Sequence, residues 1–226
     1  MIAAAPVAVV APLPPDRLSH AEAEALIATI DARLLASNSA TATLAEWCGA
    51  HGLATEPRIR AVPDRQAKGA PTPEQRARLM VGADEPVAYR RVQLVCGDHV
   101  LSEAENWFVP ARLDPAMLRA LAETDTPFGA VIAPLKPQRR TISAERLWRP
   151  LPDGWERGQG QRAAAKTCDA IPDALFRHHA LVLDATGRPI AEVAETYQRG
   201  LLAFTTPWAA RSAARCKPLP ARSLRP

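Results

Sequence analysis

Apolar residues recur at helical spacing near the start of the chain and predict one long amphipathic helix. Leu26, Ile30 and Leu34 lie four residues apart, which puts their side chains on one helix face. Ser19 precedes this stretch and Glu22 follows it three residues later, a pair typical of a capping box. The pattern therefore predicts a one-sided helix that begins after Ser19.

The following stretch predicts shorter elements. Residues 40–48 have the pattern of a second helix, and residues 53–62 have an extended pattern. Residues 63–75 contain three prolines and a glycine, which predict a loop. Asp114 followed by Pro115 predicts the start of another helix, because Asp caps helices and Pro is favoured at their first position.

From residue 86 the pattern changes to β-forming residues and predicts two hairpins. Residues 89–110 form the first hairpin, with a turn at Gly97-Asp98, and residues 178–198 form the second, with a turn at Thr186-Gly187. Helices come first and antiparallel strands follow, which is typical of an α+β fold. The chain has no glycine-rich phosphate-binding motif.

The domain organisation predicted from these patterns is a single domain over residues 18–206. Residues 148–172 contain six Pro and Gly residues and predict a long loop or insertion. Residues 1–17 are apolar and rich in Pro and Ala, without a positive segment, which favours a disordered leader and leaves a signal peptide as the alternative. Residues 207–226 predict a basic, proline-rich tail.

Charge changes the picture only through this tail. The 226 residues carry a net charge of +4. The last 20 residues contain no acid and five bases (Arg211, Arg215, Lys217, Arg222 and Arg225), so the rest of the chain has a net charge of about −1. We therefore expect no nucleic-acid surface, and no apolar stretch approaches the roughly 20 residues of a membrane span.

The four cysteines are far apart and suggest no metal site. Cys48, Cys96, Cys168 and Cys216 form no closely spaced pair and have no histidine pair nearby. Cys48 and Cys96 lie in apolar stretches, which favours two separate core residues over a disulfide. The even number leaves an oxidising compartment open.

Two charged residues on the predicted strands are candidates for chemistry. Glu195 shares a strand face with Val193 and Tyr197. If that face is buried, its carboxyl group can donate a proton near neutral pH; the alternatives are a solvated face or an arginine pair. Arg91 lies on the face opposite Val92. It can grip a carboxylate if that face lines a cavity, and the alternative is a surface arginine beside a solvated or structural Arg90.

The remaining candidates are weaker. Adjacent His178 and His179 face opposite ways on a strand and form no joint site. Arg139 and Arg140 could meet an anion, but we expect a surface charge pair. The five tryptophans are expected to serve packing, and the absence of a Gly-x-Ser-x-Gly motif gives hydrolysis no specific support.

Four segments in a fixed order resemble the chorismate pyruvate-lyase family, whose members make 4-hydroxybenzoate for ubiquinone biosynthesis. They are LLASNSATATLAEW (34–47), YRRVQLVCGDHVLSEAENWFVP (89–110), TPFG (126–129) and GRPIAEVAETYQ (187–198). Together the resemblance covers about residues 26–204. It implies a six-stranded antiparallel sheet with helices packed on one side and a buried ligand cavity.

The resemblance also implies an activity and a set of site residues. The reaction is elimination of pyruvate from chorismate, without a metal or cofactor, by a cytoplasmic monomer. Arg91 would bind the ring carboxylate, assisted by the backbone N–H groups of Ala40 and Phe128. Glu195 would be the catalytic residue near the departing oxygen.

One departure from the family and two alternatives remain open. The family's glutamate maps onto Ala194, so Glu195 needs a one-residue bulge or a longer turn to face the cavity. The segment AETYQRG (194–200) also resembles the ligand-sensing domain of GntR-type regulators. A non-catalytic domain that binds a small aromatic carboxylate is therefore the first alternative. An exported protein is the second. An attached regulator is disfavoured because residues 1–85 show no basic recognition helix.

Overall fold

The computed structural model describes residues 20–151, 153–157 and 171–205. The predicted leader (1–17) and basic tail (207–226) lie outside the described residues, as do residues 152 and 158–170 of the predicted insertion. Ser19, the predicted helix cap, also lies outside them.

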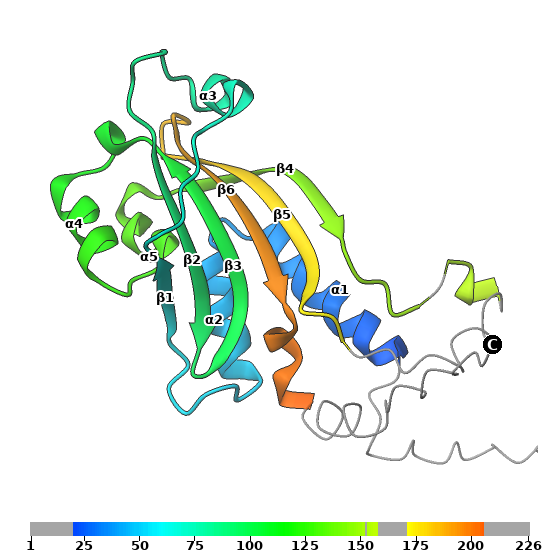
Figure 1. Ribbon diagram of the computed structural model, residues 1–226. Coiled ribbons are helices and arrows are strands. Elements are labelled where there is room, and N and C mark those ends of the chain that lie inside the picture. Colours follow the sequence, from blue (N-terminus) through cyan, green and yellow to red (C-terminus); the bar gives the residue numbers. More distant parts are fainter. Residues whose placement is uncertain (1–19, 152, 158–170, 206–226) are drawn as a thin grey trace, which may run out of the picture.

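A six-stranded antiparallel sheet forms the centre of the molecule (Figure 1). Its strands follow the spatial order β1-β2-β3-β6-β5-β4. They are β1 (Ile59–Asp64), β2 (Ala88–Cys96), β3 (His99–Phe108), β4 (Gln138–Arg146), β5 (Ala174–Leu183) and β6 (Pro189–Gln198). The predicted α+β fold with a six-stranded antiparallel sheet is confirmed.

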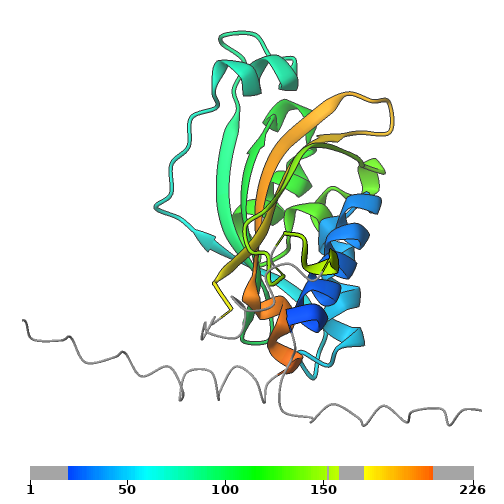
Figure 2. The ribbon, with the colours of Figure 1, turned by 90° about the vertical axis from the view of Figure 1, so that its right-hand side faces the viewer.

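Four helices pack against one side of this sheet, which we call the inner face. They are α1 (His20–Ala36), α2 (Ala40–Ala50), α4 (Pro115–Glu123) and α5 (Phe128–Val131), and Figure 2 shows α1 and α2 stacked on that side. Short 3-10 turns occur at η1 (Pro110–Arg112), η2 (Ala133–Leu135), η3 (Trp155–Arg157) and η4 (Arg199–Thr205).

The amphipathic pattern of the first helix accounts for its packing. Ile27, Ile30 and Leu34 are fully buried, one turn apart along α1, in the same core as the inner face of the sheet. Leu26 at the edge of this stripe is half-buried. Burial of three large aliphatic side chains contributes about 1.5–3 kcal/mol each relative to exposure.

The predicted turns and caps also have a physical basis. Gly97 (φ 54°) and Gly187 (φ 85°) occupy the left-handed region that favours glycine, and they connect β2 to β3 and β5 to β6. Asp114 caps α4 by accepting a hydrogen bond from the Met117 amide at 2.7 Å, with Pro115 at the first helical position.

Helix α3 (Pro73–Leu79) covers part of the opposite face of the sheet, which we call the outer face; the sequence predicts a loop there. The helix begins within the predicted loop 63–75. Thr72 and Gln75 form a reciprocal capping box, which stabilises a helix start. Leu79 then packs on Leu181 of the outer face, so the sheet is partly covered on both sides.

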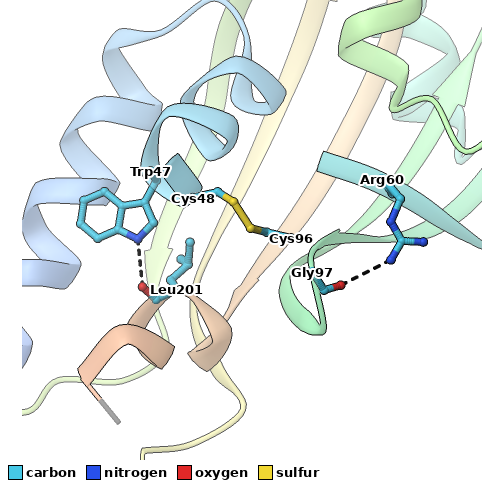
Figure 3. Close-up of a disulfide and its surroundings, with 6 residues drawn as sticks. All are labelled: Trp47, Cys48, Arg60, Cys96, Gly97 and Leu201. Carbon is cyan, nitrogen blue, oxygen red and sulfur yellow. Dashed lines mark hydrogen bonds between the residues drawn. A yellow bond between two sulfur atoms is a disulfide. The ribbon is translucent and has the colours of Figure 1, made fainter. Parts of the chain in front are cut away.

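A disulfide joins α2 to the end of β2. Cys48 and Cys96 are fully buried and bonded to each other, with their Cα atoms 6.3 Å apart, a normal disulfide separation. Beside them, the Trp47 indole donates a hydrogen bond to the Leu201 carbonyl at 2.9 Å (Figure 3). The expectation of two separate core cysteines is therefore wrong; their pairing depends on how α2 packs across the sheet.

Candidate functional site

A small cavity lies between the inner face of the sheet and the adjoining ends of α2 and α5. Its volume is about 40 Å³, space for roughly three water molecules. Its apolar wall comes from the sheet, from α5 and from the residue before η2: Val92, Leu94, Ala104, Phe128, Ile132, Val182 and Val193. Its polar side chains are those of Asn38, Ser39, Thr41, Asn106, Arg139 and Glu195. An apolar enclosure with a few convergent polar groups is the usual form of a small-molecule site.

Glu195 of β6 is the buried acid of this cavity. It is 6% exposed and lies on the inner face opposite Ala104 of β3. The pairing of β5 and β6 shifts by one residue at Ile190, since Leu183 pairs with Pro189 whereas Val182 pairs with Ala191. This is the kind of bulge that the position of Glu195 requires, because a one-residue shift changes the face to which a strand side chain points.

Arg139 of β4 forms a buried ion pair with Glu195. Its Nη2 lies 2.5 Å from Glu195 Oε2, and both side chains are less than 10% exposed. Burial alone would lower the pKa of Arg139, but the charge of Glu195 and the hydrogen bond between them raise this pKa overall. The pair is therefore a neutralised unit at one end of the cavity.

Tyr197 and His178 extend this polar cluster toward α1. The Tyr197 hydroxyl donates to Glu195 Oε2 at 3.0 Å, and burial, followed by the charge of Glu195, raises the pKa of Tyr197 well above its ordinary value. His178 lies directly opposite Glu195 on β5, with Nε2 2.7 Å from Asp31 Oδ1. The cluster thus links the cavity to the first helix through buried side chains.

The starts of two helices line one side of the cavity. The side chain of Ser39 caps α2 by accepting from the Ala42 amide at 3.2 Å, and Ala40 follows as the first residue of α2. Phe128 and Gly129 begin α5. A Cβ built on Gly129 would lie 2.7 Å from Thr41 Oγ1, so the two helix starts pack closely against each other.

Three of the four residues implied by the family resemblance line this one cavity. They are Ala40, Phe128 and Glu195. Their roles in binding or catalysis stay predictions, because the structure holds no ligand. The structure brings them together from α2, α5 and β6, which are far apart in the sequence.

The fourth residue, Arg91, points away from the cavity. Val92 and Leu94 of β2 line the cavity, so alternation directs Arg91 to the outer face. There it is exposed and lies 3.3 Å from Glu103 Oε2, an interaction that, with the charge of Glu103, raises the pKa of Arg91. The expectation that Arg91 shares a pocket with Glu195 is wrong, and Arg139 occupies the place beside the acid.

Sequence reasoning also undervalued three residues near the cavity. Arg139 was expected at the surface, and nothing in its local pattern indicates burial. Asn106 lines the cavity and faces the same side as Arg90, its partner across β2 and β3. Strand alternation, which places Val92 inward, would have placed Arg90 and Asn106 inward as well.

A second buried acid, Glu192, serves the outer face instead. Arg78 of α3 donates two hydrogen bonds to Glu192, at 2.7 and 2.8 Å, and His179 Nε2 lies 2.7 Å from Oε1. Burial would raise the pKa of Glu192, but these partners lower it overall. His178 and His179 thus face opposite sides, as predicted, and the Glu192 cluster fixes α3 to the sheet.

The described part of the chain contains neither a metal-binding cluster nor a membrane-spanning helix. No group of three or more His, Cys, Asp or Glu side chains within these residues is arranged to hold a metal ion. In the same residues, every helix is too short or too polar to cross a lipid bilayer.

The fold and cavity define an α+β domain with an enclosed polar-apolar pocket. No family model matches the sequence. The chain is similar to the "Uncharacterized protein y4mC" of Sinorhizobium fredii (strain NBRC 101917 / NGR234). The two sequences are 39% identical over 197 residues, which cover 86% of this chain and 82% of the relative. The chain therefore belongs to the same family as that protein.

Similar solved structures include regulator proteins. PhnF from Mycobacterium smegmatis is 17% identical, with a TM-score of 0.46 over 71% of this chain and 63% of PhnF, so less than two thirds of PhnF is matched. The ligand-binding domain of a putative GntR-family transcriptional regulator from Bordetella bronchiseptica is 15% identical, with a TM-score of 0.37 over 61% of this chain and 89% of that chain. Similarity at this level carries no functional information.

Proposed function

We propose that this protein is a non-catalytic domain that binds a small aromatic carboxylate in the cavity between the sheet and the starts of α2 and α5. The observation that carries the proposal is an apolar-walled cavity that contains a pre-formed buried acid, Glu195, whose charge Arg139 already neutralises. An apolar wall suits an aromatic ring, and fixed polar groups orient it.

The geometry of Glu195 supports binding over proton transfer. Both of its hydrogen bonds to described side chains, from Arg139 and Tyr197, reach Oε2. A carboxylate in such a pair only accepts hydrogen bonds, so Oε1 can receive a hydroxyl group of a ligand. In this arrangement Glu195 recognises the ligand rather than supplying a proton.

Binding requires the cavity to enlarge. A volume of about 40 Å³ is smaller than an aromatic acid needs, and Gly129 and Thr41, which both line the cavity, lie close together. Separation of α5 from α2 would enlarge the cavity without breaking the sheet. We therefore expect slow association, since binding that requires a conformational change has a low rate constant.

The test of this proposal is titration of the full chain with 4-hydroxybenzoate, followed by calorimetry and by the thermal unfolding midpoint. A Glu195→Gln variant keeps the size of the side chain but removes its charge. Saturable binding by the wild type, weakened in the variant, supports the proposal. No heat and no change in midpoint at millimolar ligand would rule it out.

Chorismate pyruvate-lyase activity is the second candidate, favoured by the position of Ala40, Phe128 and Glu195 around one cavity. The same protein is incubated with chorismate, and 4-hydroxybenzoate is followed by absorbance. Our proposal expects binding without turnover. Turnover that Glu195→Gln abolishes would instead establish the lyase.

A further inference from the structure

Arg90 is a shielded cation without a partner on the inner face of β2. Its two terminal nitrogens, Nη1 and Nη2, are closed off from solvent and have no hydrogen-bond partner among the described residues. A guanidinium group removed from water normally has a carboxylate or carbonyl partner, because its desolvation is costly. The four N–H donors of these two nitrogens therefore have no acceptor within the described chain.

Asn106, directly across from Arg90 on β3, has the same deficit. It is 4% exposed, lines the cavity, and its Nδ2 amide has no hydrogen-bond partner among the described residues. Buried polar groups are usually satisfied. Two unsatisfied donor groups facing one region indicate that the missing component is an acceptor.

The register of the sheet makes Arg90 and Asn106 continuous with the cavity. Val92, the next inward residue on β2, and Val193, the partner of Asn106 on β6, both line it. Glu195 lies two residues beyond Val193. With a rise of about 3.3 Å per residue and strands about 4.8 Å apart, the Cα atoms of Arg90 and Glu195 are separated by roughly 12 Å, a span that a small bifunctional molecule can bridge with help from the two side chains.

The electrostatic surroundings of Arg90 are positive. Arg65 follows β1, and the pairing of Asp64 with Arg91 brings it alongside Arg90. Burial, and then the charge of Arg65, lower the pKa of Arg90. No described acid offsets this repulsion by a hydrogen bond or ion pair to Arg90, whereas Arg139, which lines the cavity, is paired with Glu195.

We propose that Arg90 and Asn106 form an anion-binding subsite at the β1 end of the cavity, with Arg65 at its rim, and that this subsite receives the carboxylate of the ligand. The inference rests on the proposed function and assigns the polarity of the ligand: its acid group lies at Arg90 and its hydroxyl group at Glu195. Arg90 can make two parallel hydrogen bonds to a carboxylate, and the Asn106 amide can donate a third.

The adjacent arginines provide a matched pair of variants. Arg90→Gln removes the inward charge, and Arg91→Gln removes an equal charge from the exposed outer face. The full chain and both variants are titrated with 4-hydroxybenzoate and with its neutral analogue 4-hydroxybenzamide. We expect Arg90→Gln to weaken binding of the acid about tenfold or more and to change binding of the amide little, whereas Arg91→Gln should bind the acid like the wild type.

The unfolding midpoint without ligand separates ligand binding from a structural role. If Arg90 lacks a partner in the free protein, Arg90→Gln should leave this midpoint unchanged or raise it, because a buried repulsion is removed. A lower midpoint would show that another part of the chain neutralises Arg90 and would overturn the subsite. Asn106→Leu gives an independent check, with the same expected loss of binding of the acid.

The two probes distinguish failure of the subsite from failure of the proposed function. Equal binding of acid and amide by the wild type, or equal binding of the acid by both arginine variants, overturns the subsite while the cavity remains a ligand site. Binding of neither probe by the wild type overturns the proposed function and, with it, the subsite.

Discussion

At the scale of single residues, the inner face of the sheet carries two shielded arginines in opposite electrostatic situations. Arg139 is neutralised by Glu195 at 2.5 Å, whereas Arg90 has no hydrogen-bonded acid in the described chain. Removal of one partner of a buried pair leaves an uncompensated charge, but removal of a lone buried charge does not. The two arginines should therefore respond in opposite ways to neutral substitution.

Arg139→Met tests the buried pair. It leaves the Glu195 charge without its partner, and we expect the free energy of unfolding to fall by about 3–5 kcal/mol. Urea denaturation measures this change. Asp125→Asn is the control, because the Arg58–Asp125 pair is 64% and 42% exposed and should contribute below about 1 kcal/mol. Equal losses in both variants would contradict a buried role for Arg139, and Arg139→Met combined with Glu195→Gln should recover part of the loss.

Both tyrosines of the chain should resist ionisation in the folded protein. Burial, and then the hydrogen bond to Glu105, raise the pKa of Tyr89 to about 12, and burial, followed by the charge of Glu195, raises the pKa of Tyr197 well above its ordinary value of 10. In the unfolded chain both ionise near pH 10. The folded state then holds more protons, so stability should fall as the pH rises above about 10.

Phenolate absorbance measures this behaviour. We expect no ionisation step near pH 10 in the folded chain and a step of two tyrosines in denaturant. Tyr197→Phe should retain the slow rise of Tyr89 near pH 12 and lose the contribution of Tyr197. A folded-state step near pH 10 would show that at least one hydroxyl is not buried as the structure has it.

The residue scale also shows what the sequence can and cannot predict. Alternation along β2 places Val92 and Leu94 inward, and the structure agrees. The same alternation puts Arg90 inward and Arg91 outward. The family resemblance nevertheless gave the role of binding a carboxylate to Arg91, one position further along the strand. Arg139 had no such signal, because its burial depends on Glu195, 56 residues further along the chain.

At the scale of elements, the starts of α2 and α5 both line the cavity and lie in close contact. Gly129 allows this contact, since a Cβ there would lie 3.3 Å from Thr41 Cβ as well as 2.7 Å from its hydroxyl oxygen. Small residues at such contacts permit close approach, and added volume forces the elements apart. The space between α2 and α5 is therefore set by one residue.

Gly129→Ala should destabilise the protein by about 1–3 kcal/mol through overpacking and should speed ligand association by pushing α5 away from α2. Thermal unfolding and stopped-flow titration with 4-hydroxybenzoate measure the two effects. Gly129→Ala combined with Thr41→Ala should recover part of the stability, because contacting residues are energetically coupled. Additive losses in the double variant would mean that the two residues do not touch.

Elements with a local signal were predictable, and those that depend on distant partners were not. Helix α4 follows from Asp114 and Pro115, and both hairpin turns follow from their glycines. Helix α3 carried a signal in Thr72 and Gln75 that the prolines around it obscured. Strand β4, in contrast, is mostly exposed and lacks alternation, so only its pairing with β5 defines it.

At the scale of the whole molecule, one covalent link connects two walls of the cavity. Residues 38–41 at the start of α2 and Val92 and Leu94 of β2 line it, and the Cys48–Cys96 disulfide joins the far end of the same helix to the end of the same strand. The disulfide therefore fixes α2 on the sheet while leaving its first turn beside α5. Disulfides form and persist mainly in oxidising compartments.

Removal of this link should cost stability in proportion to the loop that it closes. A loop of 48 residues corresponds to about 4 kcal/mol in the chain-entropy model, so Cys48→Ala combined with Cys96→Ala should lower the free energy of unfolding by up to about that amount.

Cys168→Ala combined with Cys216→Ala is the matched control, which retains the link and should respond to reductant like the wild type. Protein made in an oxidising compartment should expose fewer reactive thiols when denatured than after reduction, by at least the two of Cys48 and Cys96. Reaction of all four thiols without reductant would show that the link does not form. Loss of 4-hydroxybenzoate affinity in the first variant but not in the control would further show that the position of α2 determines the shape of the cavity.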